Sequence, residues 1–119
     1  MRHLFFAIAL LIAAQSAWCQ SNHLAQTGWA SYYSRKSEGA KTASGKILHS
    51  DSLVCAHRTL PFGSSIKVVN LKNGKSVVVK VIDRGPFGKG RVIDLSYAAA
   101  DSLGMILSGV AKVELILLE

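Results

Sequence analysis

The chain has 119 residues, with 14 Lys and Arg against 7 Asp and Glu, so its formal net charge is +7, and it holds two cysteines. This length allows one domain and excludes a multidomain enzyme with a large cofactor pocket. Although 50% of the residues are hydrophobic, 15 of the first 19 are apolar against 44 of the remaining 100. Beyond residue 19 the composition is ordinary and globular, which argues against disorder, a coiled coil and a membrane-spanning protein.

The first 19 residues are predicted to form a secretory signal peptide. A basic start precedes an unbroken apolar run over residues 4–14, which is too short for the roughly 20 residues that a membrane helix needs. Cleavage follows either Ser16 or Cys19. Cys19 is alternatively the lipid-bearing cysteine of a bacterial lipoprotein, but the bulky Trp18 before it disfavours this. We expect export to the periplasm, the cell envelope or the outside, with no stable membrane span.

One folded domain is predicted over residues 28–119, after a flexible polar lead-in over residues 20–27. Cys55 lies in this domain and has either Cys19 as a disulfide partner or none. The apolar residues beside Cys55 favour a small buried thiol.

The elements of the first half are a strand, a long loop and a second strand. Aromatic and small residues predict a strand over residues 29–33. The segment 34–52 is rich in Ser, Gly and Lys and is predicted to be a surface loop of the length that is usually functional. Apolar character resumes at residues 53–57, and a turn follows at residues 60–63.

A β-hairpin is the clearest element of the second half. Two runs rich in β-branched residues, 65–71 and 75–83, flank Lys72, Asn73 and Gly74. Because Asn-Gly readily adopts positive φ angles, the pair predicts a type I′ turn.

The remaining elements are a loop over residues 84–90, a strand over 91–95, a short helix and a last strand over 110–118. Ser96 is the predicted N-cap of the helix, and Gly104 is predicted to end it. About six strands and one short helix predict an all-β fold, and closure into a small barrel would leave no exposed edges.

Two carboxylates are candidates for chemistry. Asp83 ends an apolar strand directly before Arg84, which would hold its carboxylate at the rim of a rigid sheet; alternatively, Asp83 only caps the turn or pairs with Arg84. Asp94 sits in a short strand, and its alternative role is to cap the helix that starts at Ser96.

His57 lies between an apolar strand and a turn, so it is either a packed structural residue or, with an intrinsic pKa of about 6.5, a proton-transfer group. The four histidines show no metal-ligand spacing, so neither a metal nor a cofactor is predicted. In a cytosolic protein the charge would suggest nucleic acid as a partner. For an exported chain we expect no nucleic acid but an acidic extracellular polymer, the alternative being that the charge only gives solubility.

Six ordered motifs together carry a resemblance. They are GWASYY at 28–33, KTASG at 41–45, AHRTLPFG at 56–63, VN and NG within 69–74, DRGPF at 83–87 and RVIDLSYAAA at 91–100. Their order resembles the RlpA-like (rare lipoprotein A) family from Gly28 to the C-terminus. The resemblance implies a six-stranded double-psi β-barrel with one short helix, a fold shared with expansins and barwin-like domains.

The resemblance also implies an activity on the bacterial cell wall. RlpA proteins are lytic transglycosylases that cleave the β-1,4 bonds between MurNAc and GlcNAc in peptidoglycan glycan strands, leave 1,6-anhydromuramic ends, and prefer strands without stem peptides. We expect a monomer without the C-terminal SPOR domain that many relatives have, because the chain ends directly after the last predicted strand.

The family's cleft residues fall on Asp83 and His57, which the resemblance predicts to be catalytic. Asp94 matches the second cleft aspartate of expansin-type barrels, and Thr42 matches the threonine of the loop that faces it. Two positions depart from the pattern: Lys46 and His49 stand where catalytic relatives have a glutamate and an aspartate.

A lytic transglycosylase needs fewer groups than a hydrolase because the sugar's own C6 hydroxyl attacks intramolecularly. Asp83 would serve as both acid and base if burial raised its pKa; a nearby Lys46 would lower that pKa and leave the acid role to His57. The alternative is a non-catalytic, expansin-like wall-binding or wall-loosening module, which Lys46 favours. In this module Tyr32 or Tyr33 stacks on sugars, while Lys46 and Arg84 meet acidic groups. An inhibitor or another partner-binding barrel is a third possibility.

Overall fold

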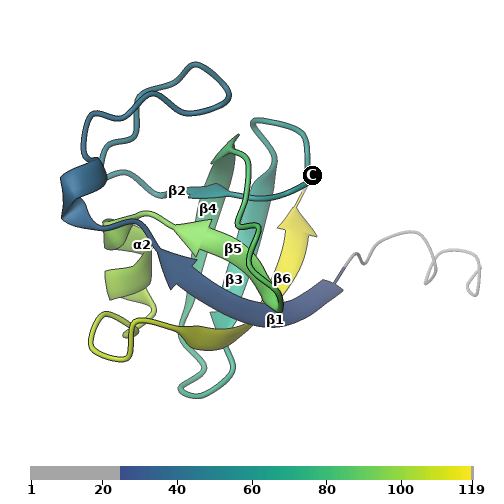
Figure 1. Ribbon diagram of the computed structural model, residues 1–119. Helices are drawn as coiled ribbons and strands as arrows, with labels where there is room; N and C mark the ends of the chain where they lie inside the picture. The colour runs from purple at the N-terminus through teal and green to yellow at the C-terminus, as the bar shows by residue number, and fades with distance from the viewer. Residues whose placement is uncertain (1–24, 119) are drawn as a thin grey trace, which may run out of the picture.

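Six strands form a closed barrel in the computed structural model, which describes residues 25–118 (Figure 1). Around the barrel the order is β1-β5-β2-β4-β3-β6. The pairs β1–β5 and β2–β4 are parallel, and the other four are antiparallel. The bounds are Ala25–Tyr32 (β1), Val54–Ala56 (β2), Ser65–Asn70 (β3), Ser76–Asp83 (β4), Arg91–Leu95 (β5) and Ala111–Leu118 (β6). The predicted all-β class and six-stranded closure are confirmed.

The first strand begins earlier than expected. β1 starts at Ala25, so the last three residues of the predicted lead-in belong to the barrel, where Ala25, Gln26 and Thr27 pair with β6. This part of the strand was not predicted because Gln26 and Thr27 are polar and because the pairing partner, β6, lies at the other end of the chain. The predicted leader, its cleavage site and the lipid or disulfide bond at Cys19 lie outside the described residues.

The core follows from the alternation of side chains along each strand. In β3, Ile66 and Val68 are fully buried while Lys67 between them is exposed. Cys55 is 1% exposed in this core, and burial raises the pKa of its thiol to about 12. This is the buried thiol that the sequence favoured.

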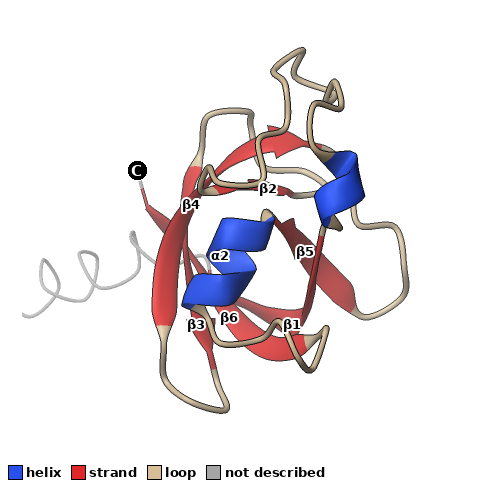
Figure 2. Cartoon of the chain, turned by 90° about the vertical axis from the view of Figure 1, so that its left-hand side faces the viewer, coloured by secondary structure: helices blue, strands red, loops and turns tan. Residues whose placement is uncertain are grey.

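The short helix α2 (Tyr97–Ser102) lies across one opening of the ring of strands (Figure 2). Ser96 caps it as predicted, because its hydroxyl accepts a hydrogen bond from the backbone N–H of Ala99. Ala99, Ala100 and Leu103 are fully buried against the core. The helix therefore closes this opening with apolar side chains.

The turn between β3 and β4 is not the one predicted. Gly74 has a φ of +76°, but no described residue other than glycine has a positive φ, so Asn73 cannot supply the second positive angle of a type I′ turn. The loop is longer: the Gly74 N–H donates to the Asn70 carbonyl (2.8 Å), and the Asn70 N–H donates to the Lys75 carbonyl (2.8 Å). The hairpin is confirmed, whereas its turn type is wrong.

The physical reason lies in a contact with the helix. The side-chain amides of Asn70 and Asn73 both donate to the carbonyl of Leu103, at 2.8 and 3.0 Å. Their side-chain oxygens in turn accept backbone N–H groups of Lys72 and Lys75. The asparagines thus shape a wider loop that is tied to the end of α2.

The long loop after β1 is held to the barrel at several points. It begins with a 3-10 turn, η1 (Arg35–Ser37), and includes an isolated bridge between Lys41 and Ile47. Leu48 anchors it with only 2% of its surface exposed. Within residues 25–118, no helix has the length and apolar character that a membrane crossing requires.

Candidate active site

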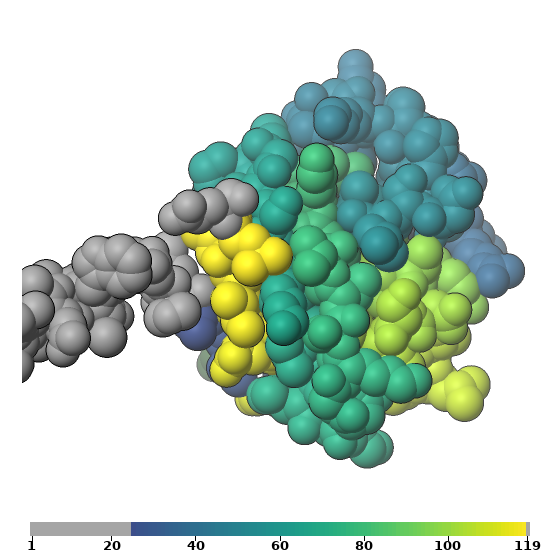
Figure 3. All heavy atoms as spheres, turned by 180° about the vertical axis from the view of Figure 1, so that it is seen from behind, coloured from purple at the N-terminus to yellow at the C-terminus, as the bar shows by residue number. Residues whose placement is uncertain are grey.

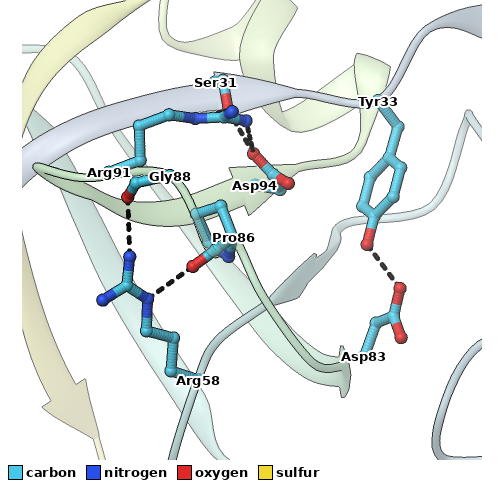
Figure 4. Close-up of polar contacts among 8 residues, drawn as sticks. All are labelled: Ser31, Tyr33, Arg58, Asp83, Pro86, Gly88, Arg91 and Asp94. Carbon is cyan, nitrogen blue, oxygen red and sulfur yellow. Dashed lines mark hydrogen bonds and ion pairs between the residues drawn. The ribbon is translucent and has the colours of Figure 1, made fainter.

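The carboxylate of Asp83, at the end of β4, collects three hydrogen bonds. The Tyr33 hydroxyl donates to Oδ2 at 2.5 Å (Figure 4). The backbone N–H groups of Ala43 and Arg84 donate to Oδ1, both at 2.9 Å. The carboxylate is therefore oriented by β1, by the long loop and by its own turn.

These contacts decide the charge of Asp83. Burial alone would raise the pKa of its carboxyl, but hydrogen bonds from Tyr33, Ala43 and Arg84, together with the charge of Arg84, lower it below the ordinary 3.8. The condition for an acid role of Asp83, a pKa raised by burial, is therefore not met, and Lys46 is not among the main causes of the lowering. Conversely, burial and then the bond to Asp83 raise the pKa of Tyr33. At neutral pH the pair is a carboxylate and a protonated phenol.

Asp94 is the second carboxylate of the site. It accepts hydrogen bonds from Ser31 and from Arg91, the latter at 2.7 Å (Figure 4). Asp83 and Asp94 are both register partners of Ala56, on the two sides of β2. Two strand spacings separate their backbones by roughly 10 Å, with both side chains on one face of the sheet. Ala56 between them is fully buried.

His57 is close to Asp83 in the backbone, but its ring has other partners. Its N–H donates to the Asp83 carbonyl at 3.2 Å. Nδ1 accepts the backbone N–H groups of Thr59 and Leu60, both at 3.2 Å, so Nε2 carries the proton and donates to Gln26 at 3.0 Å. Burial, and then the charges of Arg84 and Arg58, lower the pKa of His57. The contacts describe a neutral ring that joins β1 to the turn after β2.

The loop that carries Thr42 and Lys46 sits on the end of β4. Thr42 is 7% exposed, and its hydroxyl donates to the Lys46 carbonyl at 2.6 Å, which closes a tight turn. Lys46 itself is exposed. Farther along, His49 pairs with Glu38 at 3.0 Å. The N–H of Ser50, and then His49, lower the pKa of Glu38. Thr42 therefore shapes the loop and Lys46 projects from it.

Two arginines fasten the turns around the site. Arg84 Nη1 donates to the carbonyls of His57 and Leu60, and its guanidinium lies 4.0 Å from the centre of the Phe62 ring. Arg58 donates to the carbonyls of Pro86 (2.5 Å) and Gly88 (2.7 Å), which fixes the loop after Asp83 (Figure 4). Both arginines thus have positioning contacts.

The two neighbouring tyrosines lie in different surroundings. The Tyr32 hydroxyl donates to the Ile106 carbonyl at 2.8 Å, and its ring packs edge-on against Tyr97. Tyr33 alone reaches Asp83. Sequence reasoning named both tyrosines but missed Ser31, Arg91 and the N–H of Ala43. A backbone donor has no sequence signal, and the Ser31–Asp94 contact depends on the pairing of β1 with β5. Within residues 25–118 no group of three His, Cys, Asp or Glu side chains is placed to hold a metal ion.

Known proteins resemble this chain over the whole barrel. Residues 25–115 match the family described as lytic transglycolase. The probable endolytic peptidoglycan transglycosylase RlpA of Aquifex aeolicus is 55% identical over 87 residues, covering 73% of this chain and 38% of the relative. The endolytic peptidoglycan transglycosylase RlpA of Pasteurella multocida is 49% identical over 102 residues, covering 84% and 35%. The chain spans about a third of the length of these relatives.

A solved structure confirms the type of barrel. The expansin of Clavibacter michiganensis superimposes with a TM-score of 0.64 at 22% identity, covering 81% of this chain and 51% of that one. This likeness concerns the fold alone. The fold is a double-psi β-barrel, as the resemblance in sequence implied.

Proposed function

The chain belongs to the lytic transglycolase family, and from this premise we propose that it is a lytic transglycosylase of peptidoglycan glycan strands. The names of its relatives, endolytic peptidoglycan transglycosylases, support this substrate. The proposed reaction cleaves the β-1,4 bond between MurNAc and GlcNAc and forms a 1,6-anhydromuramic end. We further propose that a monomer acts in the cell envelope and prefers strands without stem peptides.

The observation that carries the proposal is the ionised, hydrogen-bonded carboxylate of Asp83. In the reaction the C6 hydroxyl of MurNAc attacks its own C1, the bond from C1 to the leaving oxygen breaks, and no water is consumed. The hydroxyl must lose a proton while the leaving oxygen gains one. A carboxylate with a lowered pKa is in the correct state to accept the C6 proton.

We propose that Tyr33 transfers the proton from Asp83 to the leaving oxygen. Its hydroxyl gives a proton to the leaving oxygen and takes from Asp83 the proton that came from C6, so the pair ends as it began. Burial is the largest cause of the raised Tyr33 pKa, and the hydrogen bond to Asp83 and the charge of Asp83 are the next largest. These two causes vanish once Asp83 is protonated, so Tyr33 becomes a stronger acid at the moment when it must donate.

Asp94 and His57 receive supporting parts in this proposal. The Asp94 side chain, paired with Arg91 on the same face, favours the positive charge that develops at C1. His57 positions the turn after β2 through its two backbone donors and Gln26. Proximity of the C6 hydroxyl supplies much of the remaining rate advantage.

The direct test is product analysis. The chain is incubated with glycan strands stripped of stem peptides, and mass spectrometry should find new 1,6-anhydromuramic ends. Binding to intact cell-wall sacculi without such ends would refute the enzyme and support the non-catalytic, wall-binding alternative. Lys46, in the position of the family's catalytic glutamate, is the feature that favours this alternative.

Replacing Tyr33 with Phe tests the proton relay. We expect the rate to fall by about 10²-fold. Since Tyr33 is a cause of the lowered Asp83 pKa, this pKa should rise. In the native chain, activity should persist into mildly acidic solution and be lost as the pH falls through the lowered pKa. In the variant the residual activity should be lost at a higher pH, and a pH–rate profile that does not move would contradict this role.

A further inference from the structure

A basic hollow lies between the loop of residues 42–46 and the end of β4, where Ile82, the residue before Asp83, lines it. It has a volume of about 210 Å³. Figure 3 shows this side of the molecule, where the segment near residue 60 lies beside the end of β4 and the loop rises above them. The lining residues are Ser44, Lys46, Phe62, Gly63, Lys80, Val81 and Ile82.

Backbone contacts join this basic hollow to the site. Ile82 directly precedes Asp83, and the N–H of Ser44 donates to the Ile82 carbonyl at 3.1 Å. The N–H of the neighbouring Ala43 holds the Asp83 carboxylate itself, at 2.9 Å. The loop thus presents one residue to the carboxylate and the next to the hollow. A chain-like ligand lying on Asp83 would place its adjoining unit here.

The charged side chains that line the basic hollow are all positive. Lys46 and Lys80 are both exposed, and no lining residue is acidic. Arg84 lies at the edge with its guanidinium over Phe62. The two ion pairs found within residues 25–118, His49–Glu38 and Arg91–Asp94, involve none of these cations. Such an arrangement attracts an anionic group.

The volume and the lining of the basic hollow indicate which anionic group it can bind. The volume lies below the roughly 300 to 1,000 Å³ of sites that enclose a whole small molecule, so the hollow takes one substituent of a larger ligand. The Phe62 ring, 43% exposed, adds an apolar surface for a methyl group or a sugar face. In a glycan strand, the substituent with a carboxylate and a methyl group is the lactyl group of muramic acid.

Building on the proposed function, we propose that Lys46 and Lys80 bind the free lactyl carboxylate of a muramic acid residue in the basic hollow. In intact peptidoglycan this carboxyl is the point of attachment of the stem peptide, as an amide. The group is an anion only after the peptide has been removed. Lys46 and Lys80 would therefore select stripped strands by charge.

The test measures binding separately from cleavage. In the Asp83→Asn background, which leaves strands intact, titration calorimetry compares stem-free strands with the same strands whose carboxyls have been converted to methylamides. We expect the free carboxylates to bind about fivefold to tenfold more tightly at low salt, and this ratio to shrink as salt is added. In K46Q/K80Q both ligands should bind equally.

The matched control removes the same charge elsewhere. Lys72 and Lys75 lie at the far end of the β3–β4 hairpin, so K72Q/K75Q should keep the ratio. Equal binding of the two ligands by the parent, persistence of the ratio in K46Q/K80Q, or no binding at all would overturn the lactyl-carboxylate site. The ratio of the two affinities is measured in the Asp83→Asn variant and does not depend on cleavage, whereas cleavage is measured as anhydro ends formed by the chain with Asp83 intact. If the affinities differ as expected but the native chain forms no anhydro ends, only the proposed lyase activity is refuted.

Discussion

Replacing Asp83 with Asn should lower the rate of 1,6-anhydromuramic product formation by about 10³-fold. Asn retains an oxygen that can accept the N–H groups of Ala43 and Arg84, so the turn is expected to stay in place. It has no carboxylate to accept the C6 proton or to pass one to Tyr33. The loss should appear in kcat, because the side chain acts in the transition state and sugar binding does not require its charge.

The control for this loss is Asp101→Asn, which removes an equal charge from an exposed position on α2. This variant should retain the native rate. Thermal unfolding of both variants separates a lost proton acceptor from a lost fold. A folded Asp83→Asn variant with the native rate would exclude Asp83 as the base and leave the reaction without the group proposed for it.

Replacing Asn70 with Ala should lower the free energy of unfolding by about 2–3 kcal/mol. Asn70 is 3% exposed, and its amide donates to the Leu103 carbonyl while its oxygen accepts the N–H of Lys72. Alanine leaves a buried space and removes a partner from each of these backbone groups. Chemical denaturation should show a lower midpoint with an unchanged slope.

Asn73 provides the comparison, because its amide donates to the same Leu103 carbonyl from an exposed position. Asn73→Ala should cost about 1 kcal/mol or less, since water can replace the lost contact. Equal losses in the two variants would mean that burial of Asn70 contributes nothing. Backbone amide exchange can monitor the unfolding of α2, and its midpoint should be lower in Asn70→Ala than in Asn73→Ala.

Much of the fold could be read from local patterns. The runs of β-branched residues in β3 and β4, the position of Asn73-Gly74 and the capping serine at Ser96 each predicted an element that the structure confirms. These signals are local, since they depend on residue type and on backbone preferences within a few residues. The start of β1 and the type of turn were predicted wrongly because each depends on a distant partner, β6 and Leu103 respectively.

The candidate site divides in the same way. The sequence by itself determined that Asp83 ends an apolar strand at the rim of a sheet, and the family motifs drew attention to His57, Thr42 and Lys46. Only the tertiary structure decided the charge of Asp83, because the donors that hold it ionised, Tyr33 and Ala43, lie 50 and 40 residues away in the chain.

The ring of His57 was also decided by the tertiary structure, because it is linked to Gln26, 31 residues away. A residue's type and its place in a strand are properties of the local sequence. Its pKa and hydrogen-bond partners are set by groups that the closed barrel brings within a few ångströms, and local patterns carry no record of these neighbours.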